Sequence, residues 1–199
     1  MCIRDSFTSD FLKDTLTGEA LPPVFQGHYR ISPDGEKIAY LKRSSPFLWI
    51  SKLDGTSAVE VRVEGSPYIS HDITWSPDSS QLAFSAPNGR GSDLGVDLWV
   101  VKADGTGLRR VATPEYDGVQ FMDPAWSPDG KVIAFTHRVY SDTEYESVWV
   151  VNEDGTNPHL LVDVAFGPKW SAKGNEIAVL RERVIARLES LLVSVDLGQ

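Results

Sequence analysis

The sequence has 199 residues, of which 41% are hydrophobic and 24% are charged, proportions typical of a globular protein that buries a core as one domain. Nineteen lysines and arginines stand against 28 aspartates and glutamates, so the net charge of −9 makes nucleic acid and anionic membranes unfavourable partners. The single cysteine, Cys2, excludes an internal disulfide, a cysteine-based zinc site and a redox thiol pair. No run of about 18 apolar residues occurs, so no membrane span is predicted.

Two short segments precede the repeated part of the chain. Residues 1–6, MCIRDS, read like translated adapter sequence, so we interpret them as a non-native leader of an incomplete reading frame. Within residues 7–27, the stretch LKDTLTGEALPPV (12–24) has the pattern of a closing hairpin with Thr17 and Gly18 in the turn. We expect residues 7–27 to be the remnant of a preceding structural unit. A secretory signal pattern is not visible, and we expect any targeting signal to lie upstream.

One turn phrase then occurs four times. The serine of the turn is followed seven residues later by an alanine in every copy, and successive copies begin 44, 51 and 44 residues apart. This period lies in the range of β-propeller blades and well above that of leucine-rich or β-helical coils. The copies are ISPDG (31–35), WSPDS (75–79), WSPDG (126–130) and WSAKG (170–174).

The third copy shows the predicted unit of four short strands. A strand ending at Trp126 enters the turn, KVIAFTH (131–137) forms the second strand, SVWVVN (147–152) the third and PHLLV (158–162) the fourth. Asp154-Gly155 between the last two is a strong signal for a type I′ hairpin. A four-stranded sheet that is apolar on both faces must stack on its neighbours. We expect the six tryptophans, which occupy two repeat positions, to fill the gaps between such sheets: Trp75, Trp126, Trp170, Trp49, Trp99 and Trp149.

Residues 177–192 allow two interpretations. Alignment with residues 133–148 preserves the turn offset and favours two strands. A spacing of three and four residues would instead indicate an amphipathic helix, with apolar positions at Ile177, Leu180, Val184, Leu188 and Leu191.

The phrases WSPDGKVIAF (126–135) and VWVVNEDGT (148–156) resemble the WD40-like repeat of TolB-type β-propellers, and the resemblance covers residues 28–199. It implies an all-β propeller with about four consecutive four-stranded blades, the last incomplete, in a ring of six to eight. The same repeat is similar to the N-terminal propeller of prolyl oligopeptidase-family enzymes and to some polysaccharide lyases, so the fold does not decide the function. The expected blades span residues 28–68, 69–118, 119–163 and 164–199.

Catalytic and metal-binding motifs are missing from the sequence. The G-x-S-x-G of an α/β-hydrolase is absent, and GRGSDLG (89–95) is interpreted as a loop. The four histidines include no H-E-x-x-H pair. The acidic stretch SDTEYES (141–147) lacks the glycine-centred spacing of a calcium loop. We therefore predict no catalytic residue, no resident metal and no cofactor.

Polar residues recur at two positions of the first strand, which lines the central channel of a propeller. Alignment on the turn serine gives the occupants of the two positions in the four copies. The first position holds His28, Asp72, Asp123 and Gly167, and the second holds Arg30, Thr74, Ala125 and Lys169. In the resemblance to propellers, polar residues there would bind a ligand, a metal or the end of a partner chain. The structural alternative is that they satisfy strand backbone groups or channel water. The candidate residues are His28, Arg30, His71, Asp72, Asp123 and Lys169, with His71 beside Asp72 as a pair in which the carboxylate could fix the imidazole tautomer.

The resemblance to TolB-type propellers implies a non-catalytic scaffold that binds proteins in the bacterial periplasm, including a peptidoglycan-associated lipoprotein. The alternative is the N-terminal gating propeller of a prolyl oligopeptidase-family serine peptidase whose catalytic domain lies outside this chain. A lyase with a metal in the channel is a third interpretation. It is disfavoured because His28 and His71 occupy different repeat positions.

Overall fold

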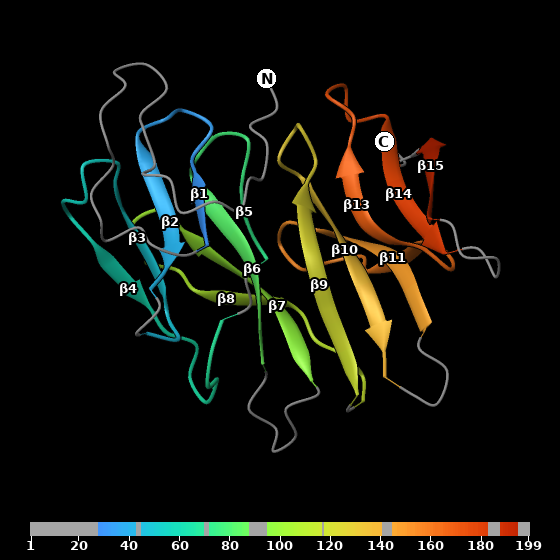
Figure 1. The fold of residues 1–199 in the computed structure, drawn as a ribbon, viewed down its shortest axis with the longest axis horizontal. Coiled ribbons are helices and arrows are strands. Elements are labelled where there is room, and N and C mark those ends of the chain that lie inside the picture. Colours follow the sequence, from blue (N-terminus) through green and yellow to red (C-terminus); the bar gives the residue numbers. More distant parts are fainter. Residues whose placement is uncertain are drawn as a thin grey trace.

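The computed structural model describes residues 28–42, 45–69, 72–87, 95–116, 118–140, 145–182 and 188–194. Over these residues the secondary structure is entirely β, with fifteen strands that follow one another as four meanders (Figure 1). None of the described residues belongs to a helix with the length and hydrophobicity needed to cross a bilayer. The all-β blade architecture predicted from the repeat is confirmed.

Each meander pairs strands that are consecutive in the chain, in antiparallel order. The first contains β1 (Tyr29–Ile31), β2 (Lys37–Leu41), β3 (Leu48–Lys52) and β4 (Val59–Val61). The second contains β5 (Ile73–Trp75), β6 (Gln81–Pro87), β7 (Val96–Lys102) and β8 (Arg109–Ala112). The third contains β9 (Val119–Trp126), β10 (Val132–Val139), β11 (Tyr145–Asn152) and β12 (His159–Val162). The last contains β13 (Phe166–Trp170), β14 (Glu176–Glu182) and β15 (Leu188–Ser194). We number these meanders as blades 1 to 4.

Blades 2 and 3 touch through a backbone contact that the repeat pattern does not predict. Val96 at the start of β7 pairs in parallel with Gln120 near the start of β9, which joins β5 to β12 into one eight-stranded sheet. The contact is confined to this one residue pair, and each blade keeps its own antiparallel meander. The connection is therefore a bridge between two blades and does not merge them.

The segment for which a helix was considered forms strands, so the helical interpretation of residues 177–192 is wrong over its described part. Strands β14 and β15 pair in continuous antiparallel register from Glu176 opposite Ser194 to Glu182 opposite Leu188. Ile177 and Val179 are buried whereas Leu180 is exposed. This alternation has the period of two that a strand requires.

The hydrophobic core lies between the blades. Each of three clusters combines residues of one blade with residues of the next, because both faces of a blade are apolar. The first cluster joins Leu48 and Ile50 to Leu82 and Phe84. The second joins Leu98 and Val100 to Ile133 and Phe135, and the third joins Val148 and Val150 to Ile177 and Val179.

The tryptophans that precede the turns connect each blade to the one before it. The indole N–H of Trp75 donates to the carbonyl oxygen of Arg30 at 2.9 Å, and that of Trp170 donates to Ala125 O at 3.0 Å. Trp126 packs in the cluster between blades 2 and 3, but its indole N–H finds no acceptor among the described atoms. The predicted packing of these rings between blades is confirmed.

The tryptophans of the third strands are each covered by a basic or imidazole side chain. Lys42 Nζ lies 3.2 Å from the Trp49 ring centre, and the Arg110 guanidinium lies 4.9 Å from that of Trp99. The His137 ring stacks on Trp149 with centres 5.3 Å apart. Such contacts shield the ring where it reaches the blade surface. Trp99 and Trp149 also pack against the clusters between blades, as predicted from their repeat position, whereas Trp49 packs against Ile38 and Tyr40 of its own blade.

Gly155 lies in the hairpin turn of blade 3, where that turn packs closely on blade 2. Its φ is +89°, and a Cβ there would lie 3.0 Å from the carbonyl oxygen of Val111 in blade 2. We expect Gly155→Ala to lower the free energy of unfolding by about 2 kcal/mol, from left-handed strain and from this contact. Gly35→Ala is the matched control, because Gly35 has φ +76° with nothing within 4 Å of an added Cβ, and about 1 kcal/mol is expected. Urea denaturation measures both, and equal losses would contradict the close packing.

Candidate functional site

The candidate site lies on the first strands of the blades, which gather next to one another. Strand β1 contacts β5, β5 contacts β9, and β9 contacts β13. This succession brings residues that are 44 to 51 positions apart in the sequence onto one side of the blades. The first strands therefore provide the surface on which the predicted channel residues can act together.

Asp123 stands at a β-bulge in β9. The register shifts between Ala134 and Thr136, so Asp123 and Pro124 together face Phe135 of β10, and Asp123 has a φ of +48°. Its carboxylate oxygen Oδ2 accepts a hydrogen bond of 3.1 Å from the hydroxyl of Thr136. Aspartate is one of the few residues with a side chain that adopts this left-handed backbone at modest cost.

Thr136 links the bulges of two neighbouring blades. Its side chain is fully buried, and its hydroxyl oxygen also accepts a hydrogen bond of 2.9 Å from the backbone N–H of Gly167 in β13. Gly167 is the repeat equivalent of Asp123, lies at a register shift in β13, and has a φ of +62°. One hydroxyl therefore fixes the carboxylate of blade 3 and the bulge of blade 4.

The electrostatic surroundings of Asp123 oppose its ionisation. Burial raises the pKa of the Asp123 carboxyl above its usual value, and the charge of Asp72 raises it further. The Thr136 hydroxyl, followed by Lys169 and Arg138, acts in the opposite direction. The structure thus brings together three of the predicted residues: Asp72, which directly precedes β5, Asp123 of β9 and Lys169 of β13.

The remaining predicted residues have other surroundings. Arg30 is exposed, and its guanidinium donates to the carbonyl oxygen of its neighbour Tyr29. The carbonyl oxygen of His28 accepts from Leu41 N in the sheet of blade 1. His71 lies outside the described residues. Among these residues the candidate site therefore centres on Asp123, and Arg30 contributes mainly backbone contacts.

Two contributors to this site were missed from the sequence, Thr136 and Arg138, because both come from the second strand. A signal for Thr136 was present, since the equivalent position in blade 2 is Ser85, a second hydroxyl in an otherwise apolar run. Ser85 is also fully buried, and its hydroxyl has no hydrogen-bond partner among the described atoms. No group of three or more His, Cys, Asp or Glu side chains within the described ranges is arranged to hold a metal ion.

Asp123→Asn should stabilise the protein at neutral pH. An acid whose pKa is raised by folding contributes stability at low pH and loses it as the pH rises through the folded pKa. We expect a gain of about 1 kcal/mol at pH 7 that disappears near pH 4, because asparagine retains an acceptor for Thr136 and carries no charge.

The control for Asp123 is Asp129, whose pKa is lowered, first by a hydrogen bond from the Ser127 hydroxyl. Asp129→Asn should therefore destabilise the protein at pH 7, and its effect should shrink as the pH falls. Thermal denaturation of the three proteins between pH 4 and pH 8 measures both. A destabilising effect of Asp123→Asn at pH 7 would contradict the assigned surroundings of Asp123.

The known proteins that this chain is similar to include peptidases and a protein assigned as TolB. No protein-family model matches the sequence. The chain is 27% identical over 136 residues to the uncharacterized peptidase YuxL of Bacillus subtilis (strain 168), which covers 64% of this chain and 17% of that peptidase. The chain therefore spans only a small part of this relative.

Solved structures show the same blade architecture. A protein assigned as TolB from Agrobacterium tumefaciens superposes with a TM-score of 0.64 at 21% identity, over 84% of this chain and 57% of that one. The acylaminoacyl peptidase of Pyrococcus horikoshii superposes with a TM-score of 0.59 at 18% identity, over 83% of this chain and 30% of that one. Identities at this level establish the fold alone. The chain has the fold of a TolB-like β-propeller, and the resemblance read from its repeat is confirmed.

Proposed function

We propose that this chain forms part of a TolB-like β-propeller that binds another protein and has no catalytic activity of its own. The observation that supports this best is Asp123, held at a left-handed bulge beside Asp72 and Lys169 with an unfavourable charge. Backbone strain together with a perturbed pKa is typical of a binding or catalytic position. Charged side chains on the first strands, with the loops at the channel mouth, fit a partner with complementary polar groups.

The proposed partner is a protein of the bacterial cell envelope, and the proposed compartment is the periplasm. Both follow from the resemblance to TolB-type propellers, for which a peptidoglycan-associated lipoprotein is the expected partner. An acidic chain with one cysteine is compatible with that compartment, since it requires no disulfide.

A second function is supported by the similarity to the peptidase YuxL and to the acylaminoacyl peptidase. The propeller would then gate the active site of a serine peptidase, and the catalytic domain would lie elsewhere in the parent protein. The same first-strand charges would contact peptides that pass through the channel. The two functions differ in whether the parent protein hydrolyses a peptide.

The parent protein, expressed from the gene recovered by sequencing the DNA on both sides of this reading frame, separates the two functions. Binding to purified peptidoglycan-associated lipoprotein is measured by surface plasmon resonance. We expect Asp123→Asn combined with Lys169→Gln to weaken binding by about tenfold, because two interfacial charges are removed. Lys173→Gln, a change of an exposed lysine in a turn of blade 4, is the control and should leave binding unchanged.

Hydrolysis of acetyl-alanine p-nitroanilide is measured on the same preparation, with and without a fluorophosphonate. Hydrolysis that the inhibitor abolishes, without lipoprotein binding, would establish the gating function and overturn the scaffold. Binding that is insensitive to the double substitution would exclude Asp123 and Lys169 from the interface.

A further inference from the structure

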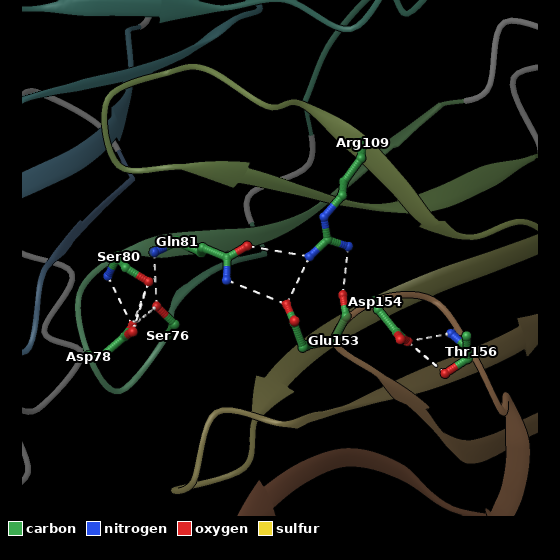
Figure 2. Close-up of polar contacts among 8 residues, drawn as sticks. All are labelled: Ser76, Asp78, Ser80, Gln81, Arg109, Glu153, Asp154 and Thr156. Carbon is green, nitrogen blue, oxygen red and sulfur yellow. Dashed lines mark hydrogen bonds and ion pairs between the residues drawn. The ribbon is translucent and has the colours of Figure 1, made fainter.

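A polar network closes the outer junction between blades 2 and 3. Arg109 of β8 donates from Nη1 to Glu153 O at 2.6 Å, and its Nη2 lies 2.9 Å from Glu153 Oε2 (Figure 2). The side chain of Gln81 in β6 contacts both partners, at 3.3 Å from Arg109 and 3.5 Å from Glu153. One carboxylate of blade 3 is thus held by two side chains of blade 2.

The repeat identifies the same junction one blade earlier, between blades 1 and 2. Val59 pairs with Ile50 as Arg109 pairs with Val100, so Val59 stands where blade 2 has the arginine. Lys37 pairs with Lys52 as Gln81 pairs with Lys102, so Lys37 stands where blade 2 has the glutamine. Ala103, which precedes the Asp-Gly-Thr turn of blade 2 as Glu153 does in blade 3, replaces the carboxylate.

These replacements leave a cavity where the network would be. An open cavity of about 440 Å³ lies between blades 1 and 2, and Lys37, Val59 and Ala103 all line it. Lys52 and Lys102 line it as well, the first from β3 and the second from the end of β7. Ile50 adds to an apolar wall with Val59 and Ala103. The cavity is therefore lined by three lysines, by Asp104 and by an aliphatic wall.

Each of the three lysines lies near one turn aspartate whose pKa its charge helps to lower: Lys37 near Asp34, Lys52 near Asp54 and Lys102 near Asp104. No ion pair of the described residues includes Lys37, Lys52 or Lys102. The neighbouring carboxylates are occupied, since Asp54 accepts from the N–H and hydroxyl of Thr56 and Asp104 accepts likewise from Thr106.

We propose that this cavity binds the carboxylate of an aliphatic ligand, which takes the place that Glu153 fills at the next junction. The carboxylate would lie among the three ammonium groups, and its methylene stem would pack on Val59, Ile50 and Ala103. The shape of the missing group, an aliphatic chain that ends in a carboxylate, favours this class over inorganic phosphate. The ligand is either a small free carboxylate or a glutamate side chain of a partner protein. This cavity is separate from the candidate site around Asp123, and the proposed ligand does not depend on the function proposed for that site.

The experiment titrates the full 199-residue chain with glutarate, with the capped peptide acetyl-Glu-Glu-Glu-Glu-amide and with inorganic phosphate. Binding is followed by the amide shifts of Ser51, Ser80 and Ala103 in ¹H–¹⁵N spectra. Glutarate binding indicates a small ligand, and binding of the peptide alone indicates a partner side chain. Either result supports the site. No shift with either, or a phosphate affinity equal to that of glutarate, overturns it.

Two variants replace a cavity lysine by the residue found at the equivalent position of the junction between blades 2 and 3. Lys37→Gln introduces the residue found at position 81, and Lys102→Asn the residue found at position 152. Each should weaken binding by about fivefold because one charge is lost at a partly exposed site. Lys173→Gln is the control with equal loss of charge and should bind as the unaltered chain does. Equal affinity of all three variants would overturn the assignment of the lysines.

Ala103→Glu provides a readout without any ligand. It supplies the missing carboxylate from within the chain, so it should raise the melting temperature and abolish glutarate binding. Ala103→Gln has the same shape without the charge and should not raise the melting temperature. A rise that is equal in both variants would show filling of the cavity by volume alone and would contradict the proposed charge recognition.

Discussion

Phe135→Ala is expected to lower the free energy of unfolding by about 4 kcal/mol, because it removes the largest fully buried side chain described between blades 2 and 3. Phe135 is 1% exposed, and its ring centre lies 4.8 Å from that of Phe121. Its Cα partner across the sheet is Trp149, so the ring is enclosed by blade 3 itself and by the facing residues of blade 2. The resulting cavity can collapse only by moving one blade relative to the other.

Phe135→Leu is the control for this loss, since it keeps an apolar side chain of similar reach and should cost about 1 kcal/mol. Guanidinium denaturation followed by tryptophan fluorescence and by far-ultraviolet circular dichroism measures both variants. The two probes should give one transition if the blades unfold together. A loss below about 1 kcal/mol for Phe135→Ala would contradict a core that lies between blades.

Trp75→Phe is expected to cost about 3 kcal/mol, the second-largest effect. The change removes part of a ring buried between blades 1 and 2 and also the indole N–H that donates to Arg30 O at 2.9 Å. The lost volume accounts for about 2 kcal/mol and the hydrogen bond for about 1 kcal/mol.

Trp126→Phe separates these two contributions. Trp126 occupies the same repeat position and is equally buried at 7% exposure, but its indole N–H has no acceptor among the described atoms. Only the volume is lost there, so about 1 to 2 kcal/mol is expected. Urea denaturation gives both values. If Trp126→Phe were the more costly change, the hydrogen bond between blades would not contribute as assigned.

The blades could be predicted from the sequence because their signals are local. The residues of each turn lie within a few positions of one another, as do Ser127, Asp129 and Gly130 in the third copy, and their hydrogen bonds form within the turn. The constant offset from the turn to the alanine then places the second strand. The bridge between Val96 and Gln120 could not be predicted, because it depends on how two blades are positioned in space.

The candidate site was predictable only in part, for a similar reason. Asp72 and Asp123 share one aligned position at the first strand and Lys169 occupies a second, so the repeat alone suggests that they share a surface. The bulge at Asp123 and the hydroxyl of Thr136 that links it to Gly167 arise from contacts between strands and between blades. Arg30 was included from its position in the repeat, but within the described residues its side chain donates to its neighbour's backbone.

The lysine-lined cavity could have been predicted from the sequence, but only by asking which polar residues of one junction are replaced by apolar residues at the equivalent positions of another. Arg109 and Glu153 are a matched pair across one junction, and the equivalent positions Val59 and Ala103 have lost both members together. A search for polar residues in each repeat finds the pair. A search for positions that are polar in one junction and apolar in the next finds the cavity.

The hydrogen bonds of Trp75 and Trp170 both run from a blade to the blade synthesised before it, to an acceptor 45 residues earlier in the chain. A nascent blade that leaves the ribosome therefore meets its acceptor on a surface that has already emerged. The C-terminal blade of each such pair carries the indole and does not have to wait for later sequence to satisfy it, so assembly can proceed in the direction of translation. The contacts between neighbouring blades can therefore form in the order in which the blades are synthesised.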